Sequence, residues 1–145
     1  MSILVDTPVW SLALRRRSAD LSSHDRQVVL ALQELARQGL VELLGLVRQE
    51  VLSGIGDKGG FLTIRDRLRA FVNTALAPQD FEEAARLSSQ CRSSGIASST
   101  VDMLICAVAL HHSWEIFTTD RDFVHYAKAI PIRLFVLPTA AGPVH

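Results

Sequence analysis

The chain has 145 residues, of which 48% are apolar and 21% charged, so it is long and apolar enough for one folded domain and is not a disordered chain. Fifteen basic and fifteen acidic residues cancel, which removes the overall basic charge that is typical of nucleic-acid-binding proteins. No apolar run reaches the ~20 residues of a membrane-spanning helix and the N-terminus lacks a basic secretory segment, so we expect a cytoplasmic protein that does not enter a membrane.

Short apolar runs alternate along the chain with segments of helical periodicity, which is the pattern of a βαβ chain. It predicts an α/β fold in a single domain over residues 1–137, with a mostly parallel central sheet of four to five strands flanked by helices, and a C-terminal tail at residues 138–145. We expect strands at 3–5, 40–44, 75–77, 114–117 and 134–137. We expect helices at about 7–14, 23–38, 46–52, 61–72, 80–93, 101–111 and 122–129.

Four acidic residues stand at or near the carboxyl ends of these strands or at helix starts. Asp6 follows the first strand, Glu50 lies in the short helix after the second, Asp102 opens an apolar helix, and Asp120 follows the strand that ends at Phe117. Ligands of open parallel sheets bind outside the carboxyl ends of the strands, so these side chains can converge there. Each aspartate can also serve as a helix cap, whereas Glu50 interrupts an apolar stretch that needs no cap.

Asp120 and Asp122 stand one residue apart in the stretch "TTDRDF". Crowded carboxylates raise each other's pKa, so this arrangement requires either solvent or a cation. Mg²⁺ and Mn²⁺ accept a ring of carboxylate oxygens without histidine or thiol ligands. Such an ion lowers the pKa of a bound water and stabilises the negative charge that develops at a phosphodiester.

Four stretches of the chain, "ILVDTPVW", "VRQEVLSG", "RSSGIASSTVDMLICAVAL" and "FTTDRDF", resemble in their order the four sequence blocks of the PIN domain family, and in particular VapC-type toxins of bacterial toxin–antitoxin pairs. The resemblance extends from Ile3 to about Leu137 and implies a PIN-like nuclease domain over residues 1–137. It implies an endoribonuclease that uses Mg²⁺ or Mn²⁺ and leaves a 5′-phosphate and a 3′-hydroxyl. The implied partners are an RNA substrate, a small VapB-like antitoxin and a second copy of the chain in a homodimer.

The resemblance also implies roles for individual residues. Pro8 departs from the family, in which Ser or Asn is usual at this position, and this removes a hydrogen bond near the metal. Either one ion or two fit the spacing, and Glu50 is expected to orient water or to complete a second metal position. The implied catalytic residues are Asp6, Glu50, Asp102 and Asp120; the metal contacts are Asp6, Asp102 and Asp120, with Asp122 as a further candidate at a variable position; Thr7 and Thr118 support the acids through their hydroxyls.

Two alternative functions remain open at this point. A catalytically inactive PIN-like module that binds RNA or protein is favoured by the zero net charge and opposed by the acids, which repel phosphate. A haloacid-dehalogenase-like phosphatase fits the run "DRDFV", but too little chain follows it for the later motifs of that fold. For a protein partner, the candidate surface is the helix with Trp10, Leu12 and Leu14 together with the helix near Phe61, unless these side chains form the core.

Overall fold

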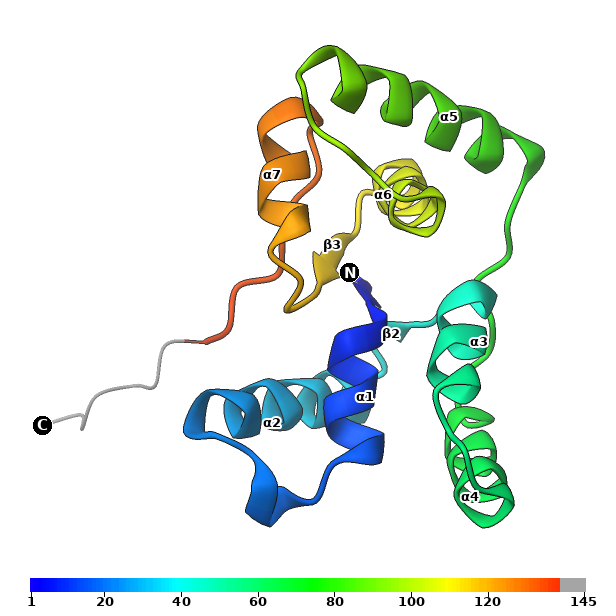
Figure 1. The fold of residues 1–145 in the computed structure, drawn as a ribbon, viewed down its shortest axis with the longest axis vertical. Helices are drawn as coiled ribbons and strands as arrows, with labels where there is room; N and C mark the ends of the chain where they lie inside the picture. The colour runs from blue at the N-terminus through cyan, green and yellow to red at the C-terminus, as the bar shows by residue number, and fades with distance from the viewer. Residues whose placement is uncertain (139–145) are drawn as a thin grey trace, which may run out of the picture.

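A parallel sheet of three short strands lies at the centre of the computed structural model, which describes residues 1–138 (Figure 1). The order is β2-β1-β3, with β1 at Ile3–Val5, β2 at Val41–Glu42 and β3 at Glu115–Phe117. Ile3 is the partner of both Val41 and Glu115, so the three strands start at the same level. Of the predicted C-terminal tail, only Pro138 lies within the described residues.

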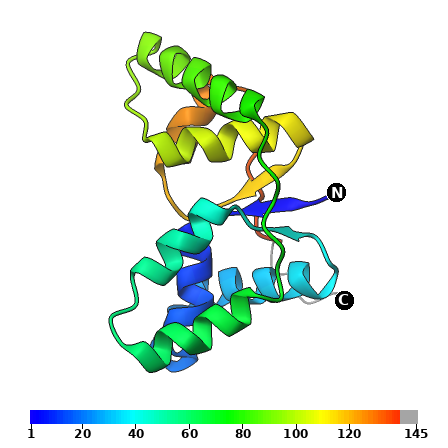
Figure 2. The same ribbon diagram turned by 90° about the vertical axis from the view of Figure 1, so that its right-hand side faces the viewer.

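Helices cover both sides of this sheet. Figure 2 shows α5, α6 and α7 on one side of the strands and α1 to α4 on the other. The three residues of β1 are all buried, which suits the central strand of a parallel sheet that is covered on both faces. The helices are α1 (Thr7–Arg15), α2 (Ser23–Arg37), α3 (Gly45–Ser53), α4 (Lys58–Leu68), α5 (Pro78–Ser93), α6 (Thr100–His112) and α7 (Asp122–Ala129), and a 3₁₀ turn, η1, spans Ser18–Asp20.

The helix α6 is the most buried helix of the structure. Every residue from Met103 to Ala109 is buried, as expected for a helix that is apolar all round. The long helix α5 packs along it, and α6 is followed directly by β3. The first turn of α6 carries Asp102, whose carboxylate lies near those of Asp120 and Asp122, beyond the carboxyl end of β3.

The α/β class and the parallel sheet are confirmed, but the predicted number of strands, four to five, is wrong for the described residues. The expected strand at 75–77 does not form. Its neighbourhood makes one isolated bridge, between Leu43 and Asn73. The N–H group of Ala77 donates instead to Asp80 Oδ2 at 2.8 Å at the start of α5, so helix capping uses a donor that a longer strand would need.

The expected strand at 134–137 is also reduced to one bridge, between Ile116 and Leu134. Ile116 donates to the carbonyl oxygen of Arg133 at 2.9 Å and accepts from the N–H group of Phe135 at 2.8 Å. Because β3 has three residues, and those on either side of Ile116 direct their backbone groups toward β1, there is no room for a second pair.

One helix boundary differs for a local reason. Helix α4 covers Lys58–Leu68, whereas the sequence predicted 61–72. Asp57 caps its start by accepting from the N–H group of Gly60 at 2.7 Å, so the last residues of "GIGDKGG" belong to the helix rather than to a loop. In residues 1–138, no helix is both long and apolar enough to cross a membrane.

Trp10 belongs to the core, so the part of the partner-surface hypothesis that rested on it is wrong. Its side chain is 2% exposed, its ring packs edge-on against Phe71, and its Nε1 donates to the carbonyl oxygen of Val5 at 3.2 Å. Leu12 and Leu14 are partly buried against the same core. In the second helix of that hypothesis, the Phe61 and Leu62 side chains are exposed.

Candidate functional site

Asp6 occupies the point where β1 ends and α1 begins. Its N–H group donates to the carbonyl oxygen of Phe117, which continues the pairing of β1 with β3 by one residue. The side chain is 4% exposed. Its Oδ1 accepts from the N–H group of Thr7 at 2.8 Å, so Asp6 does cap α1, and its Oδ2 accepts from the hydroxyl of Thr118 at 2.8 Å. Both carboxylate oxygens are therefore held in fixed positions.

The environment of Asp6 disfavours its negative charge. Burial raises the pKa of Asp6 from 3.8 to about 6, and the charges of Asp102 and Glu50 act in the same direction. The hydrogen bonds from Thr118 and Thr7 lower this pKa, but by less than burial raises it. A cation beside the carboxylate would offset the cost of its buried charge.

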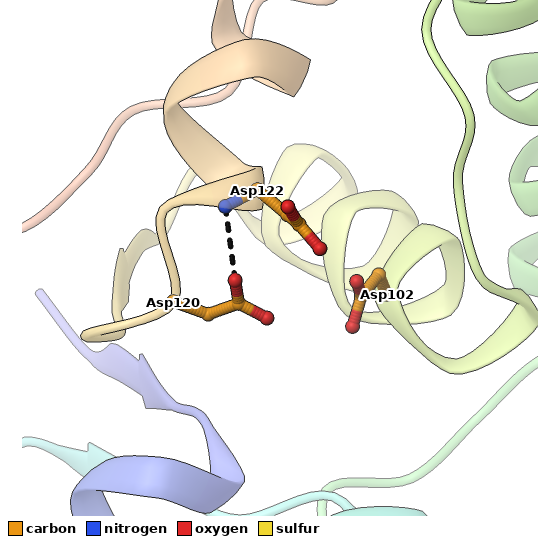
Figure 3. Close-up of side chains that lie close together, drawn as sticks. All are labelled: Asp102, Asp120 and Asp122. Carbon is orange, nitrogen blue, oxygen red and sulfur yellow. Dashed lines mark hydrogen bonds between the residues drawn. The ribbon is translucent and has the colours of Figure 1, made fainter.

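Asp102, Asp120 and Asp122 form the tightest acidic group of the described residues (Figure 3). Each offers a carboxylate oxygen, and these oxygens lie within 4.8 Å of one another. Asp102 lies in the first turn of α6, Asp120 in the loop after β3, and Asp122 at the first residue of α7. The N–H group of Asp122 donates to Asp120 Oδ1 at 2.9 Å, and this hydrogen bond orients the carboxylate of Asp120.

Tyr126 holds the Asp102 carboxylate in place. Its hydroxyl donates to Asp102 Oδ2 at 2.7 Å. Burial raises the pKa of Asp102, the nearby charges of Asp120 and Asp122 add to this, and the hydrogen bonds from Tyr126 and Ser99 oppose it. Burial and the contact with Asp102 raise the pKa of Tyr126 as well, so the phenol stays protonated and remains a donor.

Two threonine hydroxyls join the remaining acids to this group. Thr118 donates to Asp6 and accepts from the N–H group of Asp120 at 3.0 Å, which links the end of β1 to the loop after β3. The hydroxyl of Thr7 donates to Glu50 Oε1 at 2.8 Å, and Glu50 is exposed on α3. The two threonines that the sequence analysis singled out thus each contact an acid of the predicted site.

The structure arranges the predicted acids in one neighbourhood but not as one ring. Asp102 and Asp120 lie together with Asp122, the residue that was only a further candidate. Asp6 is adjacent through Thr118. The other predicted acid, Glu50, is connected to α1 through Thr7 and stands at the edge.

Sequence reasoning missed Tyr126. Its signal was present, because it is the only tyrosine of the chain and follows Asp122 by four residues, which puts both on one face of α7. That spacing does not reveal that the partner of its hydroxyl is Asp102, on another helix.

The donor set of the acidic group suits a hard divalent cation. All three members offer carboxylate oxygens, and neither histidine nor cysteine belongs to the group. Mg²⁺ and Mn²⁺ accept such oxygen ligands and keep part of their water shell, so a group open to solvent at Asp122 is compatible with them.

A pocket of about 440 Å³ lies along one side of α1. It is lined by residues of α1 from Pro8 to Arg15, by Arg16 directly after the helix, and by Asp25 and Thr119. Pro8 is tolerated near the start of α1, where its missing N–H has no helical partner to lose. Its ring lines the pocket at the position where the sequence analysis noted the departure from the family.

The PIN domain family matches residues 3–129. Similar solved structures include FitAcB from Neisseria gonorrhoeae (21% identity, TM-score 0.70, 92% of this chain and 96% of that chain) and VapBC2 from Rickettsia felis bound to a DNA fragment from their promoter (15%, 0.73, 93% and 98%). A third is a toxin-antitoxin complex from Klebsiella pneumoniae (20%, 0.64, 84% and 90%). At these identities the likeness is one of fold. A comparison with curated proteins found no match.

Proposed function

The chain belongs to the PIN domain family, and we propose that it is an endoribonuclease dependent on Mg²⁺ or Mn²⁺ that acts as the toxin of a VapBC-like toxin–antitoxin pair. The observation that carries this proposal is the group of carboxylates from Asp102, Asp120 and Asp122, whose oxygens lie within 4.8 Å of one another. PIN domains are in general nucleases, which supports hydrolysis of nucleic acid. A toxin-antitoxin complex among the structural neighbours supports a protein partner.

The residues of this chain would divide the work as follows. Asp6, Asp102 and Asp120 would hold the ion, with Asp122 as a fourth carboxylate. When bound, the ion would supply a water of lowered pKa and positive charge for the phosphodiester oxygens. Glu50 is available as a proton acceptor for that water, or for a second metal position.

The hydrogen bonds within the site would limit reorganisation during the reaction. Tyr126 fixes one oxygen of Asp102, Asp122 fixes one oxygen of Asp120 through its N–H group, and Thr118 fixes one oxygen of Asp6. Carboxylates that are already oriented do not have to be ordered when substrate binds, which favours catalysis by positioning.

The inactive binding module is the weaker alternative. A surface that only binds RNA gains nothing from acids that repel phosphate, and here burial and neighbouring charges raise the pKa of Asp6 and of Asp102. The phosphatase alternative loses its support, because "DRDFV" lies near the end of the matched PIN domain region.

Cleavage of a labelled, random-sequence RNA by the purified full chain tests the proposal. We expect cleavage with Mg²⁺ or Mn²⁺, none in EDTA, and products that carry a 5′-phosphate. Expression of the chain in a bacterial host should arrest growth of the host. Co-expression of the proposed antitoxin, a small protein encoded by a neighbouring gene, should restore growth. Cleavage that continues undiminished in EDTA would contradict the metal-dependent mechanism, while cleavage without any effect on growth would contradict the toxin role alone.

A further inference from the structure

Two pockets share the segment between α5 and α6 as a wall. Both are lined by Gly95, Ile96 and Ala97. The smaller, of about 260 Å³, adds Asp122, His125 and Tyr126, so it borders the acidic group. The larger, of about 430 Å³, adds Ser88, Arg92 and Ser98, and we call it the Arg92 pocket.

The ridge between the two pockets is low. Gly95 and Ala97 are exposed and carry little or no side chain, and Ile96 is half-buried. A single extended strand can therefore pass from the acidic group, over residues 95–97, into the Arg92 pocket. In Figure 1 this segment runs from the C-terminal end of α5 to the start of α6, close to α7.

Arg92 is the only charged residue that lines its pocket. Most of the thirteen arginines hold a carboxylate or a carbonyl oxygen, such as Arg86 with Glu83 and Arg133 with Ser113. Within residues 1–138 the exposed side chain of Arg92 makes no hydrogen bond or ion pair. It is thus an uncompensated positive charge close to the site where an anionic substrate would be cut.

The rest of the pocket suits a phosphate and its sugar. The hydroxyl oxygens of Ser88 and Ser98 lie 3.4 Å apart and are partly buried, so they supply further polar contacts beside the guanidinium group. Arginine binds phosphate through a planar fork of donors, which a lysine does not offer. Ile96 is the only large apolar side chain that lines this pocket, so it lacks the aromatic or apolar anchors that a protein partner would need.

We propose that the Arg92 pocket binds a phosphate of single-stranded RNA on one side of the cleaved bond, an inference that rests on the proposed ribonuclease function. The strand crosses residues 95–97 with its scissile phosphate at the acidic group. His125, which lines the smaller pocket, offers an imidazole face on which a base can stack. Arg92 is a binding residue in this scheme and takes no part in the chemical step.

Binding in EDTA, which prevents cleavage, tests the pocket directly. The probe is a short, labelled, random-sequence single-stranded RNA, measured with the full chain and with Arg92→Ala, Arg92→Lys and Arg67→Ala. Arg67 is the matched control, because it is also exposed and lies on α4, at the opposite end of the molecule from α5 (Figure 1). We expect Arg92→Ala to weaken RNA binding about tenfold. The slope of the logarithm of the binding constant against the logarithm of the salt concentration should become smaller in magnitude by about 0.7.

Arg92→Lys should fall between the wild type and Arg92→Ala, because lysine keeps the charge but not the fork. Arg67→Ala should bind like the wild type. Equal affinity of Arg92→Ala and Arg67→Ala would overturn the pocket while leaving the proposed function intact.

Cleavage with Mn²⁺ provides the second measurement. On the same RNA, Arg92→Ala should have a KM raised about tenfold with an unchanged kcat, while Arg67→Ala should have the KM and kcat of the wild type. Thermal unfolding of Arg92→Ala at the melting temperature of the wild type would show that the variant is folded.

A wild type that neither binds nor cleaves RNA would refute the proposed function and this inference with it. If Arg92→Ala no longer binds the co-expressed proposed antitoxin but binds RNA like the wild type, the pocket is a protein-binding surface and the inference is wrong.

Discussion

A buried aspartate from another element lies near each end of α6, and the pKa values of the two are shifted in opposite directions. Near its N-terminal end, Asp6 is 4% exposed and accepts from the N–H group of Thr7. At its C-terminal end, Asp80 is 2% exposed, accepts from the N–H group of Ala77, and lies 2.8 Å from Nδ1 of His111. The pKa of Asp6 is raised to about 6, whereas that of Asp80 is lowered.

The sign of the neighbouring charges separates these two aspartates. Burial acts to raise both pKa values. For Asp80, the hydrogen bonds from Ala77 and His111, with the charges of His111 and His112, lower the pKa by more than burial raises it. For Asp6 the neighbouring charges are those of acids, so they add to the effect of burial. Groups of the chain itself compensate Asp80, whereas the acids around Asp6 would need a cation to compensate their charge.

Cleavage activity should separate the two ends most strongly. Asp102→Asn removes the charge of a proposed metal contact without changing volume, and we expect it to lower the proposed metal-dependent RNA cleavage about a hundredfold or more. Asp80→Asn should retain most of the activity, since Asp80 contacts His111 rather than the acidic group. Cleavage rates of both variants on the same labelled RNA provide the test. Equal losses of activity would show that the difference between the two ends of α6 is unrelated to catalysis.

The pH dependence of stability should sharpen the comparison next. In EDTA the folded Asp6 keeps its proton up to about pH 6, while the unfolded chain loses it near 3.8. The free energy of unfolding should therefore fall by about 2 kcal/mol through this group as the pH rises from about 4 to about 7. Urea unfolding of the wild type and of Asp6→Asn across that range isolates the contribution, because the variant lacks it. Parallel profiles of the two proteins would contradict the raised pKa.

The Asp80 carboxylate should stabilise the fold at neutral pH, whereas the Asp6 carboxylate destabilises it there. Asp80→Ala leaves the N–H group of Ala77 and the ring of His111 without an acceptor, so we expect a loss of about 2 kcal/mol near neutral pH. Because the folded pKa of Asp80 is lowered, this stabilisation is present above the unfolded pKa and disappears as the pH falls through the folded value. Glu82→Ala, an exposed change on the same helix, is the control.

The effect of Asp102→Asn on the free energy of unfolding should be the smallest of these changes. Its sign distinguishes a metal site from a helix cap. In EDTA we expect a gain of up to about 1 kcal/mol, the usual scale for interactions of partly exposed charges, because repulsion with Asp120 and Asp122 is relieved. Added Mn²⁺ should stabilise the wild type by mass action and the variant much less. A lower melting temperature in EDTA and no response to Mn²⁺ would identify Asp102 as a cap.

The sequence alone was sufficient for features that depend on local pattern. The predicted helix at 101–111 is close to the observed Thr100–His112, because a hydroxyl cap precedes a continuous apolar run. The burial of β1 follows from its three apolar residues. The neighbourhood of Asp6, Asp102 and Asp120 also follows from their places at strand and helix ends, since the carboxyl ends of parallel strands meet at one edge of a sheet.

Only the tertiary structure decided which side chains meet across that edge. Asp122 rather than Asp6 joins the closest group, and Tyr126 on α7 donates to Asp102 on α6. The pairing of Asp80 with His111 joins residues 31 positions apart. The physical reason is the range of the interactions, because periodicity and capping act over a few residues. Such contacts, and the strands reduced to single bridges, depend on how distant segments pack, and no local pattern encodes those distances.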